Sequence, residues 1–234
     1  MSNCLTIAKR EFKSYFEAPV AYIFLIAFLV LVGFLTFSVS QLYERNVTDL
    51  QPFFFWHPWV FLLLVPASTM GLWAEERRSG TIELLLTMPV TTLQAVLGKF
   101  IAAWLFITIA ILLTLPIVGT VWYLGNPDLG AIAAGYLGSI LLAGAYVSVG
   151  MLTSSMTRNQ VISFVISLVI CFSLLLSGWE PFTNLFSRWA RPWLVDAVAA
   201  CSVVTHFESL RRGIIDLRDV VYFASVMVFM FFAT

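Results

Sequence analysis

The sequence predicts an all-α polytopic membrane protein, with six transmembrane helices, an N-terminal amphipathic helix at the membrane surface and short re-entrant helices before the last span. Hydrophobic residues make up 60% of the 234 residues and charged residues only 11%, with a mean hydropathy of +0.93. Soluble domains average about 25% charged residues. The apolar residues also gather in six runs, and a run of about 20 apolar residues is long enough to cross a bilayer.

Residues 1–234 are expected to form a single transmembrane domain that begins with an interfacial helix over residues 2–17. Apolar and aromatic residues lie on one face of this helix, and basic residues lie on the other: Leu5, Ala8, Phe12, Tyr15 and Phe16 against Lys9, Arg10 and Lys13. Such a helix lies along the headgroups. A soluble N-terminal tail is the alternative. The aromatic face and the direct continuation into an apolar run at Pro19 favour the interfacial helix.

The six predicted spans have lengths close to that of the bilayer core and cover residues 20–40, 53–74, 100–124, 129–152, 161–178 and 220–234. Pro116 should kink the third span near its outer end, because proline removes a backbone donor. The fourth span has small residues at intervals of four, which let helices approach closely in lipid. The last has roughly fourteen apolar residues, about 21 Å of helix. We therefore expect it either to continue beyond Thr234 or to tilt between its neighbours.

The segments between the spans differ in charge, and this difference predicts the orientation. With the N-terminus inside, the inner segments have a net charge of +2 and the outer segments −2. Short loops rich in Lys and Arg stay in the cytoplasm. Both termini and residues 75–99 should therefore face the cytoplasm, and residues 41–51 and 179–219 should lie outside. The second of these outer segments is apolar over much of residues 193–205, which predicts one or two short helices that dip back into the outer leaflet.

The segment 75–99 is the longest stretch that cannot lie in lipid. It opens with Glu-Glu-Arg-Arg-Ser, and Gly80 should then end this charged block. Thr81 can cap a short helix over residues 82–88, Pro89 should stop it, and Thr91 or Thr92 can cap the next helix. A plain connecting loop is the alternative. The apolar residues of the short helix favour a segment that lies in the interface or in a groove of a partner protein.

Motifs of enzymes and metal sites are absent from the sequence. Gly98-Lys99 lacks the first glycine and the hydroxyl residue of a phosphate-binding loop, and no H-E-x-x-H or C-x-x-C occurs. Two-residue spacing keeps His206 and Glu208 from acting as a pair, and we interpret His57 as an interfacial histidine close to water. The three cysteines, Cys4, Cys171 and Cys201, are expected to be apolar fillers. The chain is therefore not expected to be an enzyme by itself or to bind nucleic acid.

Two stretches carry a resemblance to a known family. EERRSGTIELLLTMPVT, followed by LGK, resembles the cytoplasmic signature of type-2 ABC exporter permeases. Phe207–Phe223 resembles the segment that enters their last span, particularly in the gliding-motility and nitrous-oxide-maturation branch. The resemblance extends over the whole chain, from the amphipathic start to the long outer loop.

The resemblance implies a permease in the bacterial inner membrane that pairs with a second copy of itself or a similar subunit and docks onto separate cytoplasmic ABC ATPases. The ATPases would bind ATP and Mg, with no cofactor in this chain. The coupling residues implied by the resemblance are Arg10, Phe12, Glu75, Glu76, Arg77, Arg78, Gly80, Thr81, Ile82, Glu83, Leu84, Leu85 and Leu86. Membrane lipids and an extracytoplasmic accessory protein are further expected partners.

The function implied is ATP-driven export of a lipid, a glycan or another amphipathic cargo. The alternative is a non-transporting membrane scaffold that couples the ATPase to an extracytoplasmic machine. An ion channel would need a polar stripe along a span, and the sequence shows none.

Overall fold

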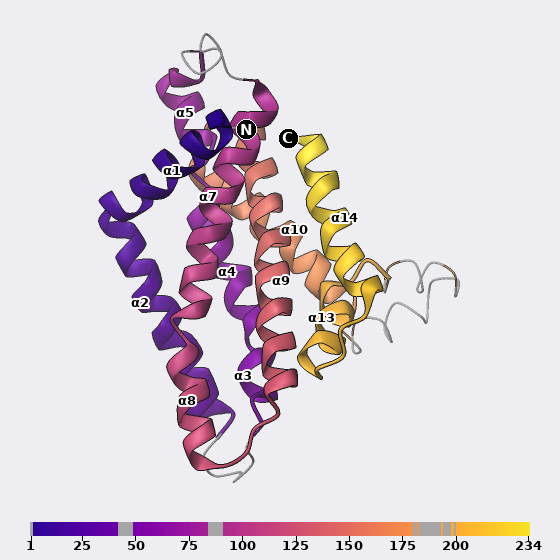
Figure 1. Ribbon diagram of the computed structural model, residues 1–234. Helices are drawn as coiled ribbons and strands as arrows, with labels where there is room; N and C mark the ends of the chain where they lie inside the picture. The colour runs from indigo at the N-terminus through magenta and orange to yellow at the C-terminus, as the bar shows by residue number, and fades with distance from the viewer. Residues whose placement is uncertain are drawn as a thin grey trace.

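The computed structural model describes residues 2–41, 49–83, 91–179, 182, 193, 198 and 200–234. In these ranges every regular element is a helix, and the long helices run alternately along an elongated bundle (Figure 1). Helix α1 (Ser2–Glu17), helix α5 (Ala74–Ser79) and the last residues of α14 (Leu217–Ala233) lie at one end of the bundle. We call this the α5 end.

The first half of the chain forms a surface helix and two passes through the bundle. Extended backbone at Ala18 (φ −91°, ψ 131°) makes the corner between α1 and α2 (Pro19–Phe34), and Pro19 suits the first turn of α2 because its missing N–H would be unpaired there. A π-helical turn, η1 (Leu35–Val39), extends α2. The chain returns through α3 (Gln51–Phe55) and α4 (His57–Thr69) and reaches α5 by a short turn.

The second half forms the remaining passes, and side-chain caps begin most of its helices. A capping box of Thr91 and Gln94 starts α7 (Thr92–Leu112), which confirms the cap predicted from sequence. The helix is interrupted before Pro116, as predicted, and continues as α8 (Leu115–Leu124). Asp128 and Asn159 cap the next two helices, α9 (Leu129–Met156) and α10 (Gln160–Leu176). Ser202 caps α13 (Val203–Arg211), and Asp216 caps α14.

Helix α9 occupies the centre of the bundle and contacts α4, α7, α10, α13 and α14. Its glycines make these contacts close. A Cβ on Gly138 would fall 2.9 Å from Leu210, and one on Gly144 would fall 2.8 Å from the sulfur of Met227. The close packing predicted from the small residues is therefore confirmed, with neighbours inside the same chain.

Four helices in the described part of the chain are long and apolar enough to cross a membrane: Ala21–Val39, His57–Ser79, Thr92–Leu124 and Leu129–Met156. They correspond to the first four predicted spans. Helices α10 and α14, with 17 residues each, correspond to the last two. The chain is therefore a multi-pass membrane protein, with apolar side chains exposed along α2 where lipid would contact it.

Two residues predicted on the apolar face of α1 differ in exposure: Ala8 is buried together with Ile7 where α1 packs against α7, whereas Leu5 is 64% exposed. One sequence interpretation, that of His57, is wrong. His57 does not meet water. Its side chain is fully buried, and Nδ1 lies 2.8 Å from Ser139 Oγ. Since that hydroxyl donates its proton to the Gly135 carbonyl, the histidine Nδ1–H must be the donor to Ser139.

The predicted re-entrant segment lies largely outside the described residues. Its described helix, α13, packs on α9 and α14. His206 and Glu208 do not pair, as predicted: His206 Nδ1 lies 2.6 Å from Asp219 Oδ1, while Glu208 accepts from Arg211 and Arg212. The His206 contact ties α13 to the start of α14.

Candidate functional site

The candidate site is the junction of α1, α5, α7 and α9 at the α5 end. Helix α5 contains the charged Glu-Glu-Arg-Arg-Ser block, with its acidic residues in the first turn and its basic residues in the last. This order favours a helix, because each charge lies at the end of the helix dipole that attracts it. Gly80 ends the helix at φ 74°, in the left-handed region that glycine adopts without strain. The predicted end of the charged block is confirmed.

A single hydroxyl joins α5 to the central helix. Ser154 Oγ, on α9, accepts hydrogen bonds from the backbone amides of Trp73 (2.9 Å) and Ala74 (3.0 Å) and donates to the Met70 carbonyl (2.9 Å). These bonds use the proton and both lone pairs of the hydroxyl. They also satisfy amides at the N-terminus of α5 that have no partner within the helix. A residue about 80 positions away in the sequence therefore holds the start of α5.

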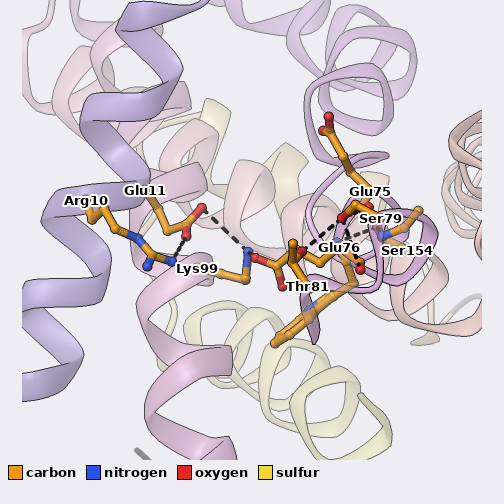
Figure 2. A network of polar contacts seen from close by, with 10 residues as sticks. Arg10, Glu11, Glu75, Glu76, Ser79, Thr81, Lys99 and Ser154 are labelled. Carbon is orange, nitrogen blue, oxygen red and sulfur yellow. Dashed lines mark hydrogen bonds and ion pairs between the residues drawn. The ribbon is translucent and has the colours of Figure 1, made fainter. Parts of the chain in front are cut away.

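Lys99 joins three helices. Its side chain, on α7, is almost completely buried, and Nζ donates to Glu76 Oε1 at 2.7 Å and lies 3.5 Å from Glu11 Oε2. Figure 2 shows the two carboxylates reaching Lys99 from opposite sides, one from α1 and one from α5. Nζ also lies 5.1 Å from the ring centroid of Trp73, within cation–π range. A buried ammonium is tolerated only when it is paired in this way.

Close packing places Glu11 where it reaches Lys99. A Cβ on Gly98 would fall 2.7 Å from Ile7 Cγ2 and 3.2 Å from the Cys4 carbonyl oxygen, so α1 can cross α7 here only over a glycine. Further along α1, the Tyr15 ring stacks on Phe106 with centroids 4.9 Å apart, and its hydroxyl donates to the Ser68 carbonyl. Burial, together with the charge of Glu11, raises the pKa of Tyr15 far above its usual value. The phenol therefore stays neutral and remains a donor.

The charges alternate along this junction. Arg10 donates to Glu11 at 2.8 Å, so that Arg10, Glu11, Lys99 and Glu76 form a row of alternating sign from α1 through α7 to α5. Among the described residues, Glu75 makes no ion pair, and the second oxygen of Glu76 is buried without a hydrogen-bond partner. The junction therefore links three helices through charged side chains, and it retains unpaired negative charge.

The structure describes ten of the thirteen predicted coupling residues; Leu84, Leu85 and Leu86 lie outside the described residues. Two of the ten, Arg10 and Glu76, belong to the ionic row. Phe12 and Ile82 are half-buried and pack on the core. The others are exposed on α5 or just after it: Glu75, Arg77, Arg78, Gly80, Thr81 and Glu83. Residues 81–83 are helical, so Thr81 lies inside the turn that it was predicted to cap.

Sequence reasoning missed the residues that hold this site together: Glu11, Trp73, Gly98, Lys99 and Ser154. One signal was available. Lys99 stands directly before a long apolar run, in a helix that starts seven residues earlier, so its side chain had to find a buried partner or leave the bundle. For Ser154 the sequence offers no comparable signal, because a serine in a row of small residues is ordinary.

Comparison with known proteins adds a family match. Residues 52–194, which include α5, Lys99 and Ser154, match the family described as ABC-2 family transporter protein. The chain is 32% identical over 143 residues to the probable multidrug ABC transporter permease YbhR of Escherichia coli K12, in an alignment that covers 60% of this chain and 37% of YbhR. It is 29% identical over 145 residues to the inner membrane transport permease YhhJ of the same strain, covering 60% of this chain and 36% of YhhJ. The match therefore spans well under half the length of either relative.

Proposed function

Because this chain belongs to the ABC-2 family of transporter proteins, we propose that it is the permease subunit of an ATP-driven exporter in the bacterial inner membrane. It is not an ATPase itself. A separate cytoplasmic ABC ATPase supplies ATP, Mg and the energy, and a second permease subunit completes the membrane part. The inner-membrane location is consistent with the name of the relative YhhJ. Within the family, we assign the chain to the gliding-motility and nitrous-oxide-maturation branch on the sequence resemblance alone.

The proposed topology has six spans, made by α2, α3–α4, α7–α8, α9, α10 and α14. Helices α10 and α14 are each about 25 Å long at 1.5 Å per residue, which is short of the hydrocarbon core by a small mismatch. The α5 end faces the cytoplasm. The more positive net charge of the inner segments supports this orientation. That α1 and the end of α14 lie on the same side of the bundle fits an even number of spans (Figure 1).

The observation that carries the proposal is that α5 is bonded directly to α9 and α7 and is linked to α1 through Lys99. The exposed side chains of α5 and the turn after it are available to an ATPase, while Ser154 and Lys99 hold the other side of α5 to α9, α7 and α1. A movement of α5 driven by the ATPase cannot leave these helices in place without breaking buried bonds. We propose that ATP-driven closure of the ATPases tilts α5 and thereby rocks the membrane helices.

The cargo in this proposal is an amphipathic molecule such as a lipid or a glycan-bearing lipid. YbhR is named as a probable multidrug permease, and an amphipathic cargo class is compatible with that name.

Reconstitution tests the proposal. The permease is placed in nanodiscs with the ABC ATPase encoded beside its gene, and complex formation and ATP turnover are measured. Arg77→Ala should weaken the complex, because Arg77 is an exposed charge on α5. Arg218→Ala removes an exposed arginine at the opposite end and serves as the matched control. Ser154→Ala should leave the complex intact but reduce the response of ATP turnover to cargo.

Equal behaviour of Arg77→Ala and Arg218→Ala would contradict the contact assignment. If ATP turnover does not respond to any member of a panel of lipids and glycans, the result favours a non-transporting membrane scaffold over an exporter.

A further inference from the structure

A cavity of about 590 Å³ lies between α1, α2, α4 and α5, beside the Lys99 junction. Pockets that take small organic molecules have volumes of about 300 to 1,000 Å³. Its lining includes five small residues, which leave room for the space: Ala18, Ala21, Ala27, Ala67 and Gly71. The proposed coupling mechanism makes no use of this cavity.

One end of the cavity is acidic. Glu11, Glu75 and Glu76 line it together with Lys99, which is already bonded to Glu11 and Glu76. Glu11 is also paired with Arg10, so that two cations stand against three carboxylates. One negative charge therefore remains in excess. Glu75 has no ion-pair partner among the described residues, and Glu76 Oε2 is buried without a hydrogen bond there. This end would be stabilised by a monovalent cation.

The rest of the cavity is apolar and partly aromatic. The rings of Tyr15, Phe24 and Phe106 form one wall, with Phe106 4.9 Å from Tyr15 and 5.2 Å from Phe24 between ring centroids. Aromatic rings supply a large apolar contact surface, which suits the hydrocarbon part of an amphiphile. At the rim on α2, Ile23 is 65% exposed on the lipid-facing side, whereas Ser79, at the acidic rim, is exposed next to the charged residues of α5.

Gly71 lies at the acidic end. A Cβ on Gly71 would lie in ordinary van der Waals contact, 3.5 Å from Glu75 Oε2 and 3.6 Å from Gln160 Nε2, so a longer side chain at residue 71 would occupy the space between these two side chains. A leucine at this position would project into the cavity beside the unpaired carboxylate.

We propose that this cavity binds an alkylammonium amphiphile without a phosphate, with its ammonium group at Glu75 and Glu76 and its apolar body along α2 and α4. Zwitterionic lipids are disfavoured, because they would bring a phosphate against the same carboxylates. An uncharged amphiphile would leave the excess charge of the site unpaired. The inference goes beyond the proposed function, since binding needs neither ATP nor the ATPase.

Equilibrium binding of tritiated dodecyltrimethylammonium to the full chain in phosphatidylcholine nanodiscs tests the proposal, with empty nanodiscs as the blank. We expect saturable binding at one site that dodecanol and dodecyl sulfate do not displace. Glu75→Gln should weaken binding about tenfold, as expected for loss of one charge-assisted contact, and Gly71→Leu should abolish it. Glu17→Gln makes the same chemical change on α1 at an exposed carboxylate outside the cavity and should leave binding unchanged.

Three results would overturn the proposal: equal displacement by all three dodecyl compounds, equal effects of Glu75→Gln and Glu17→Gln, or displacement by phosphatidylethanolamine added to the nanodiscs. The last would assign the site to a membrane lipid. Melting curves check that each variant is folded. If Gly71→Leu does not fold, the test rests on the binding affinity of the isosteric variant Glu75→Gln. Failure of the binding test leaves the ATPase-coupling proposal intact, because that proposal is tested by complex formation and ATP turnover.

Discussion

Replacing Lys99 by methionine removes the ammonium group that bonds α1 and α5 to α7 while keeping most of the length and apolar volume of the side chain. Two carboxylates, Glu11 and Glu76, then face each other across a buried space without the cation between them. Removing one partner of a buried ion pair typically costs 3–5 kcal/mol. Because the side chains of Glu11 and Glu76 are about one-fifth exposed, we expect the lower end, about 3 kcal/mol.

The melting temperature of the protein in detergent or nanodiscs, followed by tryptophan fluorescence, measures this effect. For a chain of this size a loss of about 3 kcal/mol corresponds to a decrease of about 6 to 12 °C. Trp73 lies 5.1 Å from Lys99 Nζ, so its emission also reports the local change. Lys13→Met is the matched control: Lys13 pairs with Glu17 at 3.4 Å with both side chains mostly exposed, and its loss should change stability by less than about 0.5 kcal/mol.

A double variant distinguishes the loss of the ion pairs of Lys99 from a general effect of removing a lysine. In Lys99→Met with Glu76→Gln, the carboxylate that Lys99 Nζ approaches most closely loses its charge, so the double variant should be more stable than Lys99→Met alone. If the two penalties simply add, or if Lys99→Met melts within about 2 °C of Lys13→Met, then the row of alternating charges does not hold α1 and α5 in place and the reasoning fails.

Three further predictions concern α5. Ser154→Ala leaves the Trp73 and Ala74 amides buried without partners, so it should lower the free energy of unfolding by about 2–4 kcal/mol and speed hydrogen exchange at both amides. Ser155→Ala, which loses one bond within its own helix, should cost less than half as much. Equal costs would refute the role of Ser154 as the cap of α5. Gly80→Ala should cost about 1 kcal/mol of unfolding free energy because of its positive φ, whereas Gly33→Ala, in ordinary helical backbone with free space around it, should not destabilise. A cysteine at Arg77, in a chain whose Cys4, Cys171 and Cys201 are replaced by serine, should react with an impermeant maleimide only from the cytoplasmic side; labelling from outside would reverse the topology.

Much of the fold could be predicted from sequence, because the features involved are local. The cap at Thr91 follows from its side-chain chemistry, and the end of the charged block at Gly80 follows from the conformational freedom of glycine. The interruption before Pro116 follows from the missing N–H of proline. The apolar runs can be recognised as spans because their lengths match the thickness of the bilayer core, which is fixed. None of these features depends on which helix packs beside which.

The candidate site could be predicted only in part. The exposed charges of α5 and Gly80 were recognised as a unit because they are contiguous in the sequence. The partners that hold the unit were not, since Lys99 Nζ meets Glu76 across 23 positions and Ser154 Oγ meets the Trp73 amide across 81. The part of the apolar face of α1 that is buried inside the protein could not be predicted for the same reason: the helix is amphipathic over a broad arc, and the position of α7 decides that Ala8 is covered and Leu5 is not.

The sequence by itself determined that this chain is a helical membrane protein, because a low-dielectric bilayer forces every spanning backbone to satisfy its hydrogen bonds locally. It also located some helix ends, such as the start of α7 after Thr91. The tertiary structure alone decided that Lys99 is a buried link among α1, α5 and α7, that Ser154 caps α5 and that a cavity with unpaired carboxylates lies beside them. A buried charge or a backbone amide accepts any partner of suitable chemistry. Only the packing of the helices selects which partner is near enough to form the bond.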